Sequence, residues 1–347
     1  MEAFINGSSA ISPQDTFAGG RLLQEVKEYS NVRYLRCLEP AYSSFIDPMA
    51  SRRMSRIIKM GVCSALKCLK ESGVANPDAI ITGTGMGCVE DTGKFLLSIY
   101  DNEEKLLNPT PFIQSTHNTV AAAIALLLKC NSYNSTYGHR GFSFESALLD
   151  GIMLLNEGEA ENILVGALDE LTPDLFTITD RLGFWKKGPV DNLQLRDAHS
   201  RGSLAGEGTA FFSLSHRKKP ESHAVIRSVM TYLKPSGYDH IEKIFAENGR
   251  PDLVILGING DSAGDEVYMN LRNSVFSDMP AAYYKHLCGE YDTSSAFALA
   301  MATGIIREQK VPEIMKLDEK TVTEIKNILI YNHFRNTGHS SILISSC

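Results

Sequence analysis

The chain has 347 residues, of which 43% are hydrophobic and 22% charged, enough to form the core of one large domain or of two fused halves. Its formal net charge is −7 and it has no basic run, so nucleic-acid binding is not expected. No apolar run approaches the roughly 20 residues of a membrane helix, and the N-terminus does not resemble a signal peptide. We therefore expect a cytoplasmic protein with no membrane association.

The chain contains an odd number of cysteines, and their spacings match neither a zinc site nor a C-x-x-C motif. Most lie in apolar text, which predicts buried free thiols. The seven are Cys37, Cys63, Cys68, Cys88, Cys130, Cys288 and Cys347. The glycines between Gly83 and Gly87 lack G-x-G-x-x-G spacing, so they indicate close backbone packing rather than nucleotide binding. We expect no metal and no cofactor.

Hydrophobic periodicity predicts alternating helices and strands along the chain. Helices are expected at residues 51–72, 119–129, 144–155, 238–248 and 294–306. Strands are expected at residues 133–136, 162–168, 209–214, 223–229, 327–331 and 341–344, and at the starts of the segments 77–87 and 251–260. The alternation indicates a layered α/β protein. Residues 172–205 are polar and irregular, contain the only tryptophan, Trp185, and predict a long surface excursion.

Segments 77–87 and 251–260 have the same pattern, a short apolar strand that ends in glycines. Each follows an amphipathic helix, and each is followed further along the chain by an apolar helix of small residues, at 119–129 and 294–306. Two related halves explain this repetition, and chance similarity of two buried strands is the alternative. No linker divides the chain, so we predict halves at residues 1–215 and 216–347 that share one core.

Three segments carry a resemblance to a known family. Residues 133–167 have the order strand, sharp turn, helix and acidic loop, which resembles the nucleophile region of β-ketoacyl synthases. Residues 197–209 resemble the later "GEG" loop of that family, and residues 52–56, followed by a long helix, are typical of it. The resemblance covers almost the whole chain. It implies an α/β fold of the thiolase-like αβαβα five-layer type, with two duplicated halves, and a homodimer or heterodimer.

Catalysis in the resembled family needs a cysteine at a helix N-terminus, which accepts the acyl chain. Counting back from Gly158 without a gap, that cysteine position falls on Gly141, which has no nucleophile. A shift of two reaches Ser143, and His139 could act as its base, although a histidine there is more often a structural hydrogen-bonder. The sequence around Ser143 is not the G-x-S-x-G elbow of hydrolases.

The two histidines that stabilise the enolate in the resembled family are also replaced. The H-G-T-G-T loop resembles residues 259–264, so Asn259 stands at the first histidine position. An asparagine can donate a hydrogen bond to an oxyanion but cannot carry a proton. In the K-x-x-x-G-H motif Lys285 is kept, whereas Glu290 replaces the histidine, and we expect an ion pair between these two residues. Asp265, after the loop, is expected to be a helix cap or surface group.

The family's last motif, N-S-F-G-F-G-G, is similar to residues 332–338. In the family this loop lies beside the acyl pocket, so the resemblance implies that Phe334 and Arg335 line a substrate site. A solvated polar turn is the alternative. Phe142 and Phe144 are further candidates for substrate binding, with ordinary packing as the alternative.

Because the residues at all three catalytic positions are replaced, the chain resembles a chain-length factor, the catalytically silent partner of an active ketosynthase. Residues 111–119 and 139–145 resemble ketosynthase-like proteins of aryl-polyene and flexirubin-type clusters. The resemblance implies a heterodimer that builds a fatty acid or polyene (polyketide-like) chain on an acyl carrier protein. The helix at 116–129, Phe112 and the two phenylalanines named above are candidates for setting chain length.

Three alternatives remain at this point. The first is a divergent active 3-oxoacyl-ACP synthase or acyltransferase that uses Ser143 with His139, and His117 as a further candidate. The second is a decarboxylase of malonyl carrier protein, against which Gly141 argues because it offers no group to bind substrate. The third is a binding homodimer without a ketosynthase partner.

Overall fold

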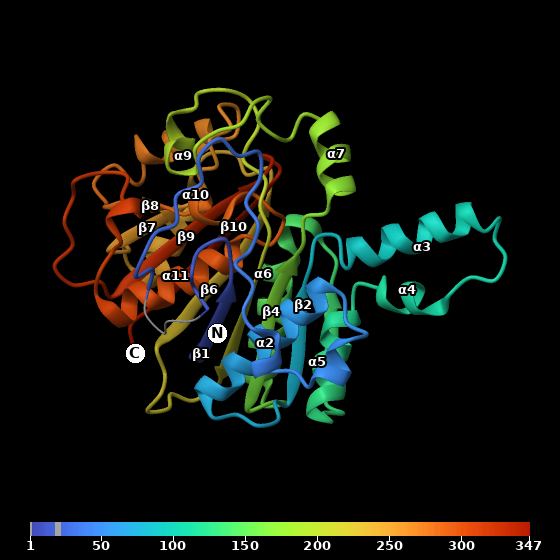
Figure 1. Cartoon of the computed structure of the whole chain (residues 1–347). Coiled ribbons are helices and arrows are strands. Elements are labelled where there is room, and N and C mark those ends of the chain that lie inside the picture. Colours follow the sequence, from blue (N-terminus) through green and yellow to red (C-terminus); the bar gives the residue numbers. More distant parts are fainter. Residues whose placement is uncertain (1, 18–21) are drawn as a thin grey trace.

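The protein is described by a computed structural model that covers residues 2–17 and 22–347 (Figure 1). Ten strands form one sheet. They are β1 (Ala3–Ile11), β2 (Ala79–Gly83), β3 (Tyr133–Tyr137), β4 (Asn162–Asp169), β5 (Gly208–Ser215), β6 (Ala224–Leu233), β7 (Leu253–Leu256), β8 (Ala281–Tyr283), β9 (Asn327–Phe334) and β10 (Gly338–Ser345).

The α-helices are α1 (Pro48–Ser51), α2 (Arg56–Ser72), α3 (Val89–Asp101), α4 (Pro109–Gln114), α5 (Thr119–Leu128), α6 (Ser143–Glu157), α7 (Pro173–Arg181), α8 (Asp239–Asn248), α9 (Asp265–Arg272), α10 (Lys285–Cys288) and α11 (Ser295–Glu308). Short 3₁₀ helices are η1 (Tyr42–Ser44), η2 (Arg140–Phe142), η3 (Asn192–Asp197) and η4 (Glu313–Met315).

The strand order repeats. From the middle of the sheet outward it is β1-β5-β4-β2-β3 on one side and β6-β10-β9-β7-β8 on the other. The strand directions repeat as well. On one side β2 is parallel to β3 and β4, and on the other side β7 is parallel to β8 and β9. Strands β5 and β10 are each antiparallel to both of their neighbours. The predicted repeat segments hold β2 and β7, which occupy equivalent places. The proposed boundary after residue 215 stays a prediction.

Helices and strands alternate in layers. The two sides of the sheet meet where residues 3–5 of β1 pair with residues 224–226 of β6. Helices α6 and α11 pack in the central core against strands of both sides, α2 and α5 cover the first side, and α8 and α9 cover the second. Side chains of adjacent residues, such as Ile80 and Ile81, point to different cores, as expected of strands covered on both faces. This is the five-layer α/β architecture predicted from the sequence.

Several expectations need correction. The helix predicted at 51–72 is interrupted at residues 52–55, and its longer part starts at Arg56. By strand order α11 is the equivalent of α6 rather than of α5, since α6 and α11 both connect the edge strand of their side to the third strand inward. The excursion at 172–205 is not wholly irregular, because it contains α7, and it is not all surface, because Lys186 and Asn192 are buried.

The cysteines are free thiols in the described structure, and five are buried as expected. Cys130 is half-buried and Cys347 is exposed, so the prediction of burial does not extend to these two. Among the described helices, none has the length and apolar character needed to cross a membrane.

The two outer edges of the sheet differ. At one edge, β3 pairs with β2, and its residues are exposed or half-buried. At the other edge, β8 is fully buried, because Ala282 pairs with Lys316 and Ala281 O accepts the N–H of Leu317 at 2.9 Å. In the described structure no segment pairs with β3 in the way that the segment around Lys316 pairs with β8, so the edge of β3 is uncovered.

Helices α3 and α4 form an arm that extends away from the layered body (Figure 1). They pack against each other, with the rings of Phe95 and Phe112 5.1 Å apart. Large apolar side chains on the arm are nevertheless exposed, namely Leu96, Leu97, Tyr100, Leu106, Phe112 and Ile113. So many large apolar side chains exposed on one short segment favour an interaction site.

Candidate functional site

The predicted site residues come together at the carboxyl ends of the parallel strands. Gly141 follows β3, Asn259 follows β7, Lys285 follows β8 and Phe334 ends β9. In open α/β sheets this edge is where ligands bind, because loops leave the strands there and the helices begin. The repeated topology thus brings segments from both halves of the chain to one place.

Gly141 lies directly against Phe334. A Cβ atom added to Gly141 would be 2.4 Å from the Cβ and 2.5 Å from the Cγ of Phe334, far inside van der Waals contact. The packing is reciprocal, because a Cβ on Gly338 would be 2.6 Å from the Cζ of Phe142. The turn after β3 and the β9–β10 hairpin therefore interlock through two phenylalanines and two glycines. The position predicted for a nucleophile has no room for a side chain.

The other two family positions form one hydrogen-bonded group. Lys285 Nζ is 2.7 Å and Asn259 Nδ2 is 2.6 Å from the same oxygen, Oε2 of Glu290. The Lys285 side chain is 1% exposed and that of Glu290 20%. The sequence predicted the ion pair between Lys285 and Glu290. It did not predict the contact with Asn259, which comes from a different loop.

Asp265 fixes the loop that carries Asn259. Its two carboxylate oxygens accept the N–H groups of Asn259 at 3.0 Å and Gly260 at 2.8 Å. Burial raises the pKa of Asp265 to about 6, although these hydrogen bonds act in the opposite direction. Asp265 is the first residue of α9, and its carboxylate ties the start of this helix back to the preceding loop.

The structure does not bring the His139 ring to the Ser143 hydroxyl. Ser143 is buried, and its Oγ accepts the backbone N–H of His139 at 2.8 Å while lying 2.7 Å from Arg140 O and 2.9 Å from Thr84 O. The His139 ring instead has Nδ1 3.4 Å from Ser146 Oγ. The hydroxyl of Ser143 is thus engaged by backbone groups at the start of α6.

The remaining predicted residues have different surroundings. Phe144 is fully buried in the central core against Phe212, which favours the alternative of ordinary packing, and its role in substrate binding stays a prediction. Phe142 packs on Gly338 and against the His139 ring. The exposed His117 lies beside Gly87 and Gly138, and its ring is close enough to limit side chains there.

A pocket of about 350 Å³ opens beside Glu290. Asn259 and Glu290 lie on one wall, and Phe184, Trp185 and Phe334 supply aromatic surface. The residues from the 172–205 segment were not predicted to line this site, and the single tryptophan was the only signal that pointed to them. An adjoining pocket of about 260 Å³ shares these three aromatic residues and continues towards α7.

Arg335 lies between the two pockets. Its guanidinium carbon is 3.1 Å from the centre of the Phe184 ring and 5.1 Å from that of Phe334. Its φ of +50° is a left-handed conformation that favours glycine, which is the residue of the family motif at this position. Burial raises the pKa of the nearby Asp292 to about 7, and the charge of Asp169 acts in the same direction. Arg335 therefore lines both pockets, although its side chain also remains exposed to solvent.

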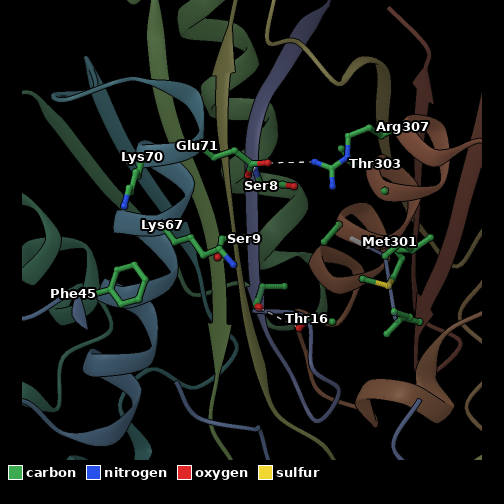
Figure 2. A pocket seen from close by; sticks show the side chains of 15 residues that line it. Ser8, Ser9, Thr16, Phe45, Lys67, Lys70, Glu71, Met301, Thr303 and Arg307 are labelled. Atoms are coloured by element: carbon green, nitrogen blue, oxygen red, sulfur yellow. Dashed lines mark hydrogen bonds and ion pairs between the residues drawn. The ribbon is translucent and has the colours of Figure 1, made fainter. Parts of the chain in front are cut away.

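A separate pocket of about 590 Å³ lies between β1, α2 and α11 (Figure 2). Lys67 and Lys70 come from α2, and Glu71 forms an ion pair with Arg307 of α11 at 3.3 Å. None of the predicted site residues lines it. Within residues 2–17 and 22–347, no group of three or more histidine, cysteine, aspartate or glutamate side chains is arranged to hold a metal ion.

Comparisons agree with this architecture. Residues 30–189 match the sequence model of the beta-ketoacyl synthase N-terminal domain. No curated protein matches the chain by sequence. Among solved structures, a chain of the AntDE:AntF (apo) complex, a type II PKS acyl-carrier protein with its ketosynthase bound to the hexaketide, has a TM-score of 0.76 at 14% identity. The ishigamide ketosynthase/chain length factor has the same TM-score and identity.

A beta-ketoacyl synthase from Burkholderia phymatum STM815 has a TM-score of 0.76 at 13% identity. Each of these three alignments covers 100% of this chain and 99% of the other. The chain therefore has the thiolase-like α/β fold of these ketosynthase structures, and its residues 30–189 are similar to the N-terminal domain of beta-ketoacyl synthases.

Proposed function

We propose that this chain is a catalytically silent, chain-length-factor-type partner of an active β-ketoacyl-ACP synthase. The observation that carries the proposal is the contact between Gly141 and Phe334. A condensing enzyme needs a nucleophile that is open to the acyl donor, whereas here the predicted nucleophile position has no side chain and is covered by a phenylalanine ring.

The group around Glu290 supports the same proposal. Decarboxylative condensation needs donors that stabilise a developing enolate. In this chain the donors on Asn259 and Lys285 already bind the carboxylate of Glu290, and a negative charge there opposes a second one.

The rival proposal, an active enzyme that uses Ser143 with His139, has no contact in its favour. Activation of a serine needs a base within hydrogen-bond reach of its hydroxyl. The backbone N–H of His139, and not its ring, bonds to that hydroxyl.

The surface for the partner subunit is proposed to consist of the arm and the edge of β3. The exposed apolar residues of α3 and α4 offer area for burial, and β3 offers unpaired backbone groups. Neighbouring structures include a ketosynthase/chain length factor and a ketosynthase in complex with an acyl-carrier protein, which supports partners of these kinds. A homodimer is the alternative assembly.

The product is proposed to be a polyunsaturated or related fatty acyl chain, as in aryl-polyene and flexirubin-type pigments. This finer statement rests on residues 111–119 and 139–145. Phe112 is on the exposed arm, where a bulky side chain can reach a partner's acyl tunnel and limit its length.

The test is to produce the chain alone and together with the active β-ketoacyl-ACP synthase of the same organism, and to measure intact masses after incubation with a reactive acyl donor. We expect a stable complex and an acyl adduct on the synthase only. An adduct that maps to Ser143 would establish the rival enzyme. A chain that condenses acyl units alone and forms no complex would refute the silent-partner role.

A further inference from the structure

Glu290 is held by two donors that converge on one of its oxygens. Asn259 Nδ2 and Lys285 Nζ are 2.6 Å and 2.7 Å from Oε2, and in the described part of the chain neither nitrogen makes another hydrogen bond. A buried ammonium needs a counter-ion, and charge-assisted hydrogen bonds of this length are strong. The two nitrogens form a cradle for a single anionic oxygen.

The cradle is positioned by groups other than the Glu290 carboxylate. The backbone N–H of Asp261 donates to Asn259 Oδ1 at 3.0 Å, which fixes the opposite nitrogen towards Glu290. The N–H of Asn259 itself donates to Asp265. Lys285 is fully buried as the first residue of α10, so its stem has little freedom. Both donors are therefore expected to stay in place when the carboxylate is removed.

The backbone of Glu290 is fixed as well. Its N–H donates to Leu204 O at 2.8 Å, and its carbonyl accepts the N–H of Gly206 at 3.0 Å. The side chain extends from this anchored position to the cradle and forms part of the wall of the 350 Å³ pocket. The pocket is also lined by Asp261, Asp292 and Arg335, so Glu290 is one of three carboxylates that an entering anion would meet.

We propose that Glu290 is an intramolecular ligand of a preformed anion site. Its carboxylate occupies the position that a small carboxylate or an acyl oxyanion would take, and it excludes anionic groups such as malonyl units from the pocket. The pocket is left open to neutral acyl groups, which its aromatic walls can contact. This inference rests on the proposed loss of catalysis at the site, and it does not depend on the partner role.

The variant Glu290→Ala tests the proposal with acetate as the probe. Trp185 is the only tryptophan and lines the pocket, so tryptophan fluorescence reports on this site alone. We expect the variant to lose roughly 5–10 °C in Tm, because a buried charge has lost its partner. Acetate is expected to restore most of that loss and to shift the Trp185 emission with a Kd of about 1–10 mM.

Acetamide, which has the same shape without the charge, is the matched control and should have no effect at equal ionic strength. The wild type should not respond to acetate, and neither should a double variant that combines Glu290→Ala with Lys285→Met. If Glu290→Ala does not fold unaided, the refolding yield with acetate or acetamide gives the same readout, and equal yields overturn the proposal.

Equal responses of the wild type and Glu290→Ala to acetate, or equal effects of acetate and acetamide, would also overturn the proposal. None of these outcomes bears on complex formation with a ketosynthase. A failed anion test and a failed partner test can therefore be told apart.

Discussion

Phe334 occupies the space into which a side chain on Gly141 would extend. We expect Gly141→Cys to destabilise the protein by roughly 1–3 kcal/mol, because an added side chain overpacks a closed contact. Equilibrium unfolding in urea measures the loss. The variant should also fail to gain acylation, since the new thiol has no open approach.

Gly93 supplies the matched control for this variant. It lies within α3, and a Cβ added there has no atom within 4 Å, so Gly93→Cys should be neutral or slightly stabilising. In a double-mutant cycle, Phe334→Ala should reduce the cost of Gly141→Cys. Independent, additive effects of the two substitutions would contradict the contact.

Arg56 and Glu207 join α2 to the loop before β5. Two parallel hydrogen bonds of 2.7 Å and 2.6 Å connect them, and the side chain of Glu207 is fully buried. Arg56→Met should cost about 3–5 kcal/mol of the free energy of unfolding, because it removes the closest cation from a buried carboxylate and leaves only Arg36, at 3.9 Å. Thermal and urea unfolding measure the loss.

The exposed ion pair between Lys94 and Glu90 is the control for Arg56→Met, and Lys94→Met should cost under about 1 kcal/mol. If both variants lost the same free energy of unfolding, the buried ion pair of Arg56 would contribute no more to stability than the exposed pair of Lys94, which would contradict the prediction.

His339 should make the protein sensitive to acid. Burial lowers the pKa of His339 to about 4, whereas an unfolded histidine has a pKa of about 6.5. Between about pH 4 and about pH 6.5 the unfolded chain therefore binds more protons at His339 than the folded protein does. The contribution of His339 to the free energy of unfolding is complete above about pH 6.5 and is lost as the pH falls towards 4. His339→Gln should flatten the pH dependence of the free energy of unfolding in this window.

The exposed His216 is the control, and His216→Gln should leave the same profile unchanged. Asp292, whose pKa is raised to about 7, contributes with the opposite sign, because the folded protein then binds the extra proton. A difference between His339→Gln and the wild type that grew above pH 7 would contradict the assignment to His339.

The arm should be needed for assembly and not for folding. Leu97 is 57% exposed on α3, so Leu97→Glu should change the free energy of unfolding by less than about 0.5 kcal/mol. In a complex that buries this face, the same change would place a charged side chain in the interface. A loss of at least about 1.4 kcal/mol in binding free energy would raise the Kd at least about 10-fold. Analytical ultracentrifugation with the ketosynthase measures the Kd.

Leu233, on β6, is 76% exposed outside the arm, and Leu233→Glu is the matched control with an unchanged Kd. A Kd unaffected by Leu97→Glu would remove the arm from the proposed interface without excluding a partner elsewhere.

The sequence predicted those strands and helices whose hydrophobic pattern is visible within a short segment of the chain. Buried strands such as β2 and β7 are continuous apolar runs, and their equivalent places were correctly inferred. The central strand β1 was missed, because residues 3–11 contain glycine, serine and asparagine, and only tertiary packing makes this segment a strand. Helices α3 and α4 were also missed, and in the structure they pack against each other with large apolar side chains left exposed.

At the site, the contact between Lys285 and Glu290 could be predicted because a short, recognisable motif spaces them. The contacts of Phe334 with Gly141 and of Asn259 with Glu290 join separate loops, and their distances depend on how the two sides of the sheet meet. The sequence gives the type of each residue, whereas the packing around that residue depends on the tertiary structure. The filled nucleophile position therefore became visible only in the structure.

The unequal edges of the sheet have a consequence for assembly size. A protein with two free edges can add a neighbour at each and grow into a filament. In the described structure β8 is covered by the segment around Lys316, whereas the edge of β3 is uncovered. Pairing through β3 uses up the open edge of both subunits, so growth by this route ends at two chains.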